Sequence, residues 1–189
     1  MNITVTQGNI VDHPVEVIVN AANSDLRVGS GVCAAIHAAA GPELEELCNF
    51  ALKTWGRTPP GEVTFTLPGN LSARFVCHAV APIYHQTLVS IRGAMLMSVY
   101  TRAIGDSAGY RCKSIAFPAL GTGVYGWPKL EAAKIAVSVA RMYQAAGMDM
   151  DIVFVAYDDE TFDIYSSLLE LTDMGNYRPH PEDVEHVPA

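Results

Sequence analysis

The chain is short of positive charge. Of its 189 residues, 12 are Lys or Arg and 20 are Asp or Glu, which gives a formal net charge of −8 at pH 7. Proteins that coat nucleic acid neutralise phosphates with a basic surface, and this composition does not supply one. The balance of charge therefore argues against a nucleic-acid partner. It also means that an anionic ligand must be held by local backbone N–H groups, because the overall field of the protein repels it.

Long apolar runs and paired metal ligands are also missing. No stretch approaches the roughly 18 uninterrupted apolar residues of a membrane span, so no membrane partner is expected. The four cysteines, at positions 33, 48, 77 and 112, lack the paired spacing of a metal site. We expect them to be buried free thiols in a reducing compartment. The first residues already alternate like a strand and leave no room for a signal peptide, so the expected location is cytoplasmic.

What the sequence does contain is a strand that leads into a glycine-rich loop. The β-branched run at 15–20 predicts a strand buried on both faces, which delivers Asn20 and Asn23 to its C-terminal end. A Gly-Ser-Gly loop at 29–31 follows, and an alanine-rich segment at 32–40 predicts a helix. Ligands in α/β sheets gather beyond the carboxyl ends of strands, and glycine-rich loops that enter a helix offer N–H groups to phosphate. Because asparagine suits sugar hydroxyls, the pattern predicts a site for ribose and phosphate.

A second glycine-rich loop, A-L-G-T-G-V-Y-G at 119–126, lies between a predicted strand at 114–117 and a helix opened by Pro128. An ordinary connecting turn is the alternative, but two such loops at strand ends favour a ligand site. Both loops also match the dinucleotide fingerprint G-x-G-x-x-G/A. The first match begins nine residues after Asn20, and Pro128 places the second wholly before its helix, so neither has the required context. A nicotinamide-binding Rossmann fold is therefore disfavoured.

The rest of the chain alternates strands with helices. Its hydrophobic content of 50% and its length suit one well-packed domain. Alternation of this kind predicts a largely parallel sheet with helices on both faces. In the long helix expected at 89–108, Ile91, Met95 and Val99 are spaced to form one buried face. The expected strands are 2–6, 15–20, 62–67, 74–79, 114–117 and 152–157, and the expected helices are 32–40, 42–54, 89–108, Pro128 to near Gly147, and Asp158 to about Leu171.

Two motifs in these loops resemble a known family. V-N-A-A-N-x-x-L at 19–26, followed by G-x-G-V-x-x-A-I-H-x-A-A-G at 29–41, resembles the macrodomain family, which binds ADP-ribose and in many members hydrolyses ADP-ribosyl esters. The resemblance continues through 61–66, 75–82 and 117–128. It implies a three-layer α/β/α sandwich with a mixed, largely parallel central sheet. We expect this macrodomain to span residues 1–172 and the polar, proline-rich tail at 173–189 to be disordered.

The resemblance also implies roles at the adenine end of a ligand. Asn9, in Gly8-Asn9-Ile10, matches the aspartate of the family's G-D-I, which accepts from the adenine amino group; without a charge its bond is weaker. An asparagine chosen only for a turn is the alternative. Tyr157 matches the aromatic residue that stacks on adenine, and a core tyrosine is the alternative. The family usually has serine where this chain has Gly121, in the loop that closes over the diphosphate, and Tyr125 of that loop lies beside the distal ribose.

At the other end, Asn23 matches the asparagine that holds the distal ribose. Cys33 stands where catalytically active relatives usually carry an aspartate that orients or activates water. Two roles remain open for Cys33: its thiol takes part in catalysis, or its side chain is a small apolar residue that fills space. His37 lies four residues later on the same helix face, and we interpret it, like His78 in its apolar strand, as structural.

The resulting hypothesis is an enzyme of the O-acetyl-ADP-ribose deacetylase type. It would bind ADP-ribose and hydrolyse the acyl ester on its distal ribose, in O-acetyl-ADP-ribose or in a protein ADP-ribosylated on Asp or Glu. A water assisted by the substrate phosphate would attack, with no metal or cofactor required; the alternative is a module that binds ADP-ribose without chemistry. Asn23 and Cys33 are the catalytic candidates, and the ligand-binding candidates are Asn9, Ile10, Ala21, Asn23, Gly29, Ser30, Gly31, Val32, Cys33, Gly121, Thr122, Gly123, Val124, Tyr125 and Tyr157.

Overall fold

The strands form one 6-stranded sheet in the order β1-β6-β5-β2-β4-β3. This is a computed structural model that describes residues 1–175, and the side chains of residues 1–171. Neighbouring strands are parallel except for the antiparallel pair β3–β4, so the predicted mixed, largely parallel sheet is confirmed. The strands are β1 Ile3–Gln7, β2 Val17–Ala21, β3 Val63–Thr66, β4 Phe75–Ala79, β5 Ser114–Pro118 and β6 Asp151–Ala156.

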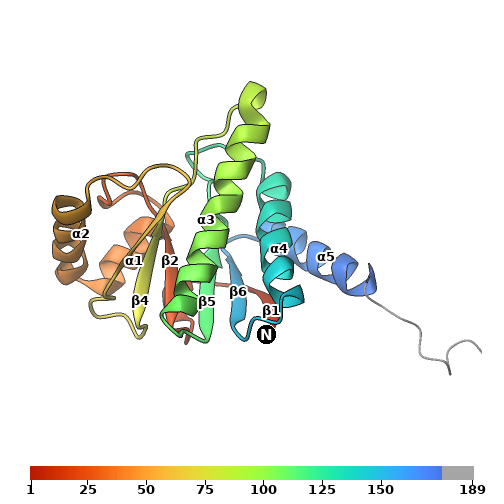
Figure 1. The fold of residues 1–189 in the computed structure, drawn as a ribbon, viewed down its shortest axis with the longest axis horizontal. Helices are drawn as coiled ribbons and strands as arrows, with labels where there is room; N and C mark the ends of the chain where they lie inside the picture. The colour runs from red at the N-terminus through yellow and green to blue at the C-terminus, as the bar shows by residue number, and fades with distance from the viewer. Residues whose placement is uncertain (176–189) are drawn as a thin grey trace, which may run out of the picture.

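Helices cover both faces of the sheet (Figure 1). One core of buried side chains lies between the sheet and α3, α4 and α5, and a second lies between the sheet and α1 and α2. Val17 and Val19 of β2 belong to the first core and Ile18 to the second, as the alternation of side chains along a strand requires. The three-layer α/β/α sandwich is therefore confirmed. The helices are α1 Val32–Ala40, α2 Pro42–Trp55, α3 Val89–Gly109, α4 Lys129–Ala145 and α5 Asp159–Gly175, with short 3-10 helices η1 Ile10–Asp12 and η2 Gln86–Leu88.

Most predicted boundaries agree with the observed ones to within a few residues, but α5 continues to Gly175. The expected domain limit at 172 and the disorder expected for 173–189 stay predictions, because residues 176–189 lie outside the described residues. None of the helices in the described part of the chain is both long enough and apolar enough to cross a bilayer.

The buried face predicted for the long helix α3 is wrong at its start. Ile91 is 62% exposed, and the buried positions begin only at Leu96 and continue through Val99 and Tyr100. Figure 1 shows the first turns of α3 rising beyond the ends of the strands, where no layer of the sheet lies beneath them. The spacing of apolar residues identified a helix, but the edge of the sheet decides where burial begins.

A buried polar cluster crosses the strands β2, β4 and β3 beneath α2. The side-chain nitrogen of Asn20 lies 3.2 Å from Nδ1 of His78, and because an amide nitrogen only donates, that ring nitrogen is the acceptor. Nε2 of His78 then carries the proton and lies 2.9 Å from Oγ1 of Thr66 and 3.6 Å from Sγ of Cys48. Burial, with a smaller effect from His37, lowers the pKa of His78 to about 3. His78 is therefore a structural residue. The side chain of Asn20 bonds to it within the sheet and is not directed to a ligand.

This cluster predicts a specific loss of stability in acid. Above pH 6.5 the ring of His78 is neutral in both the folded and the unfolded chain. Between pH 6.5 and about 3 only the unfolded chain gains the proton, so the free energy of unfolding should fall by about 1.4 kcal/mol per pH unit on account of this ring. Urea unfolding between pH 7.5 and 4.5 should show a shallower pH dependence in His78→Gln than in the natural protein, with His85→Gln, which removes an exposed histidine, as the matched control. An NMR titration in which His78 of the natural protein gains its proton near pH 6.5 would contradict the prediction.

Candidate functional site

A cavity of about 740 Å³ opens beyond the C-terminal ends of the parallel strands. Its wall comes from the segments that follow β1, β2, β4, β5 and β6 and from the start of α1. Every ligand-binding residue predicted from the sequence lines it, so the structure brings together residues from distant parts of the chain. Those residues are Asn9, Ile10, Ala21, Asn23, Gly29, Ser30, Gly31, Val32, Cys33, Gly121, Thr122, Gly123, Val124, Tyr125 and Tyr157.

Asn23 holds the loop that follows β2. Its side-chain oxygen accepts from the backbone N–H groups of Asp25 (3.1 Å) and Arg27 (3.2 Å), and its side-chain nitrogen donates to the carbonyl of Arg27 (2.8 Å). Both lone pairs of the oxygen are then in use, and one amide hydrogen remains. Asn23 can therefore offer a ligand a single hydrogen-bond donor while its acceptor keeps the loop closed.

Cys33 also serves this loop. It lies in the first turn of α1, is 3% exposed, and accepts from the backbone N–H of Gly29 with an N···S distance of 3.4 Å. Its thiol lies 3.9 Å from the carbonyl oxygen of Arg27, to which it donates. Through these two contacts the thiol ties the two ends of the 27–33 turn together. The other three cysteines are buried free thiols, as expected.

The second glycine-rich loop is anchored by Trp127. The indole N–H donates to the carbonyl of Pro82 (2.7 Å), and the backbone N–H donates to that of Gly121 (3.0 Å). Gly121 has φ +81, and a Cβ there would lie 2.6 Å from Cδ1 of the Trp127 ring. Both features favour glycine at position 121, where the family resemblance alone would place a serine. Gly123 is different, because its φ is not in the left-handed region and a Cβ there would meet nothing within 4 Å.

The two loops line the cavity with residues whose backbone N–H groups are unused within the described part of the chain. The N–H groups of residues 30–32 and 123–125 donate to no acceptor within the described part of the chain, and all of these residues line the cavity. The first set stands at the N-terminus of α1, where the helix dipole also favours negative charge. The arrangement can therefore hold an anion without a basic side chain.

The remaining part of the wall is formed by the turns after β1 and β6. Asn9 caps η1, and its side-chain oxygen lies 3.4 Å from the backbone nitrogen of Val11. Asn9 therefore has the turn role expected from the sequence as the alternative to adenine binding. Tyr157 is 90% exposed, so it is not a core tyrosine. Its free ring stands at the rim of the cavity, available to stack on a planar group.

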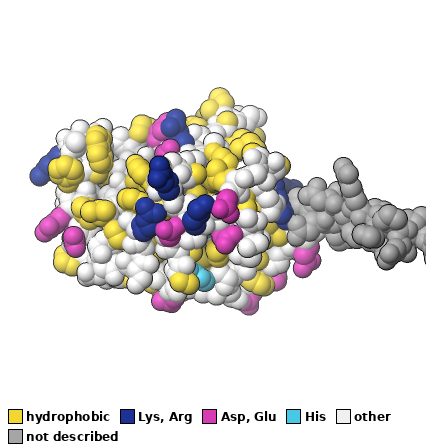
Figure 2. All heavy atoms as spheres, turned by 60° about the horizontal axis from the view of Figure 1, so that its bottom comes forward, with side chains coloured by type: hydrophobic (Ala, Val, Ile, Leu, Met, Phe, Trp, Pro, Cys, Tyr) yellow, Lys and Arg dark blue, Asp and Glu magenta, His cyan; other side chains and the backbone are white. Residues whose placement is uncertain are grey.

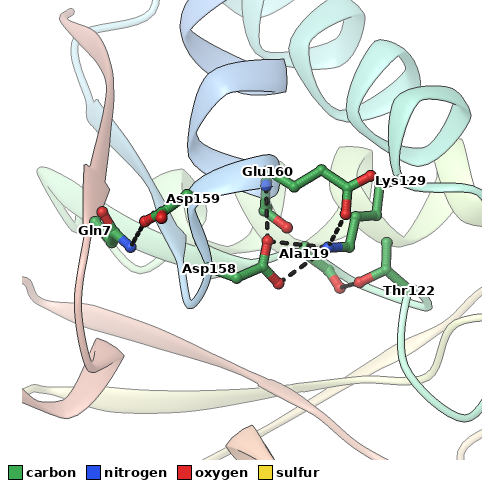
Figure 3. Close-up of polar contacts among 8 residues, drawn as sticks. Gln7, Ala119, Thr122, Lys129, Asp158, Asp159 and Glu160 are labelled. Atoms are coloured by element: carbon green, nitrogen blue, oxygen red, sulfur yellow. Dashed lines mark hydrogen bonds and ion pairs between the residues drawn. The ribbon is translucent and has the colours of Figure 1, made fainter.

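From the sequence, Asp158 was expected only at the start of the last helix, but it also lines the cavity. It does cap α5, accepting from the backbone N–H of Thr161 (2.8 Å). Lys129 donates to both of its oxygens (2.9 and 3.0 Å) and to Glu160 (2.7 Å), as Figure 3 shows. The hydrogen bond from Lys129, followed by those from Thr161, lowers the pKa of Asp158 to about 2. Its place directly after Tyr157 is the signal that could have assigned it to the wall.

Basic side chains do not line this cavity; among its described lining residues the one charged side chain is that of Asp158. Lys and Arg side chains lie beside Asp and Glu at the opposite end of the sheet, which Figure 2 brings forward. There Arg74 pairs with Glu16 (3.1 Å) and Lys113 with Asp149 (2.7 Å), in segments that precede strands.

No group of three or more His, Cys, Asp or Glu side chains in the described residues is placed to hold a metal ion. His37 is 7% exposed and lies outside the wall of the main cavity. Burial lowers its pKa, with an opposing effect from Glu45, so the ring is neutral at pH 7. These positions agree with the structural role expected for His37.

The chain is similar to several known proteins. The family model described as Macro domain matches residues 19–136. An O-acetyl-ADP-ribose deacetylase of Enterobacter cloacae is 44% identical over 88% of this chain and 93% of that protein. An Oceanobacillus iheyensis macrodomain solved with ADP superposes with a TM-score of 0.86 at 34% identity, covering 90% of this chain and 91% of that one. A Trypanosoma brucei macrodomain solved with ADP-ribose superposes with a TM-score of 0.79 at 30% identity, covering 89% of this chain and 69% of that one.

The geometry of the second loop predicts opposite effects for two neighbouring glycines. Gly121→Ala should lower the free energy of unfolding by about 2 kcal/mol or more, because a left-handed φ and an overlap with Trp127 both oppose the new methyl group. Gly123→Ala meets neither obstacle and should raise the free energy of unfolding by up to about 1 kcal/mol through a less flexible unfolded chain. Chemical denaturation of the two variants makes the comparison. Equal losses would mean that the loop is not held against Trp127 as described.

Proposed function

This chain belongs to the macrodomain family, and on that premise we propose that it binds ADP-ribose in the cavity and hydrolyses the acyl ester on the distal ribose. The observation that carries the proposal is that both glycine-rich loops line one cavity with residues whose N–H groups have no acceptor in the described part of the chain, while no basic side chain is among the described lining residues. Diphosphate is the part of ADP-ribose that such donors suit. The substrates are O-acetyl-ADP-ribose or cytoplasmic proteins carrying ADP-ribose on Asp or Glu.

In this proposal the ligand lies across the cavity from the β6 side to the start of α1. Adenine stacks on the exposed ring of Tyr157 beside Ile10 and Asn9, all of which line the wall. The diphosphate accepts from the N–H groups of residues 30–32 and 123–125. The distal ribose then reaches Asn23 and Tyr125, and the remaining amide hydrogen of Asn23 is donated to a ribose hydroxyl.

The proposed reaction consumes one water and needs no metal. The water attacks the ester, the bond between the acyl group and the ribose breaks, and the products are ADP-ribose and a carboxylic acid. A phosphate oxygen of the substrate receives the proton of the attacking water and passes it to the ribose oxygen that leaves, so that the hydroxyl of ADP-ribose is restored. The thiol of Cys33 is not used as the base, because it donates to Arg27 and accepts from Gly29.

Binding without chemistry is the second candidate, and one observation favours it. The wall of the cavity, within the described residues, includes no His and no carboxylate other than Asp158, which is paired with Lys129. A module of this kind would hold ADP-ribose and release it unchanged. The two candidates share the binding site and differ only in turnover.

Turnover and its dependence on two residues test the enzyme. With O-acetyl-ADP-ribose as substrate, we expect weak but measurable release of acetate, little change in Cys33→Ala and a gain in Cys33→Asp, since a carboxylate can orient water. Asn23→Ala should lower the rate at least tenfold, about 1.4 kcal/mol in the barrier, because the distal ribose is released. A large loss in Cys33→Ala would make the thiol catalytic. Absence of turnover in every variant, with ADP-ribose still bound, would leave the binding module.

Binding should depend on loop backbone and not on a basic side chain. Gly123→Val should weaken ADP-ribose binding by at least ~2 kcal/mol, because the new side chain fills space that the phosphates need while the fold itself has room for it. Arg27→Ala is the control, since only the backbone of Arg27 holds the loop. Calorimetry with ADP-ribose gives both affinities. Equal losses in the two variants would refute the role of the backbone donors.

A further inference from the structure

A carboxylate lines the cavity that the proposed function assigns to ADP-ribose, an anionic nucleotide. Asp158 is the one charged side chain among the described lining residues, and the whole chain already carries a net charge of −8. Like charges repel, most strongly where water is partly excluded. An uncompensated Asp158 would therefore oppose the binding of an anionic nucleotide.

Asp158 has a structural reason to be there. It accepts from the backbone N–H of Thr161 and so caps α5, which begins at the residue after it. The same turn carries Tyr157, whose ring stands at the rim. The fold thus uses an acidic cap next to the place where the ligand would lie.

Lys129 compensates this charge from behind the wall. It is the first residue of α4 and does not itself line the cavity. Its ammonium group donates to both oxygens of Asp158, at 2.9 and 3.0 Å, and to Glu160 at 2.7 Å (Figure 3). The side chain of Lys129 is 28% exposed, less than the 48% of Asp158 and the 71% of Glu160, so the cation is the most shielded member of the group.

We infer that Lys129 is a positioning residue that neutralises Asp158 and thereby gives the site its preference for an anionic nucleotide over a neutral nucleoside. The inference rests on the proposed binding of ADP-ribose. The competing explanation is that the ion pairs of Lys129 only tie α4 to the start of α5, which stabilises the fold without favouring a charged ligand. A tie would matter equally for charged and uncharged ligands, whereas neutralisation matters only for the charged one.

The test compares ADP-ribose with adenosine, which lacks the phosphates. Lys129→Met leaves Asp158 and Glu160 uncompensated, and calorimetry at low salt should show ADP-ribose binding about tenfold weaker and adenosine binding changed less than twofold. The loss should shrink as salt is added, because salt screens exposed charges. Lys129→Arg keeps the charge and should bind ADP-ribose within about twofold of the natural protein.

Two further variants separate charge from structure. Lys129→Met combined with Asp158→Asn removes one charge of each sign, and asparagine still caps a helix, so ADP-ribose affinity should return to near that of the natural protein. Lys113→Met is the matched control: it removes a lysine that is paired with Asp149 at 2.7 Å and lies directly before β5, at the N-terminal ends of the strands, and it should change binding less than twofold.

The outcomes are distinct. Selective loss of ADP-ribose in Lys129→Met, with recovery in the double variant, supports the inference. Equal losses for both ligands, no recovery, or the same loss in Lys113→Met would overturn it. A natural protein that binds no ADP-ribose would instead overturn the proposed function, and the inference with it.

Discussion

The parallel pairing of β2 with β4 on one side and β5 on the other is the contact on which the site depends. Its hydrogen bonds place Val17 beside both Phe75 and Ile115, so the three strands end at the same edge of the sheet. The segments that leave β2 and β5 are the two glycine-rich loops. Because β2 is buried on both faces, shifting its pairing by one residue would exchange the side chains of the two cores. Burial on both faces therefore fixes the register of β2.

The cavity at this edge is built mainly from small side chains and backbone. Glycine and alanine leave room for a ligand. The unused N–H groups at 30–32 and 123–125 supply hydrogen-bond donors, and no Lys or Arg is among the described lining residues. Trp127 keeps the second loop in place through Pro82 and Gly121. Among the described lining residues the one carboxylate belongs to a helix cap, and Lys129 forms an ion pair with it from outside the wall.

Asn23 and Cys33, the two catalytic candidates, also have structural roles. Asn23 and Cys33 both hold the turn after β2, through contacts with Arg27 and Gly29. A rigid first loop would fix the distal ribose relative to the phosphates, which is the arrangement that hydrolysis assisted by substrate phosphate requires. The same rigidity would serve a module that only binds, so the contacts of these two residues are compatible with either function.

The sequence by itself determined most of the strands and helices, the resemblance to the macrodomain fold and many of the residues of the wall, because each of these depends on local patterns: β-branched runs, glycine-rich loops and the two motifs near residues 19–41. It did not determine what the side chains of those residues contact. Only the tertiary structure showed that Asn9 caps η1, that Ile91 projects beyond the sheet, and that Lys129 reaches Asp158. Lys129 begins α4 and Asp158 caps α5, and Ile91 is exposed beyond the edge of the sheet; neither relation is present until the chain has folded. Hydrogen bonds and burial depend on the partners that folding brings close, and spacing along the chain does not encode them.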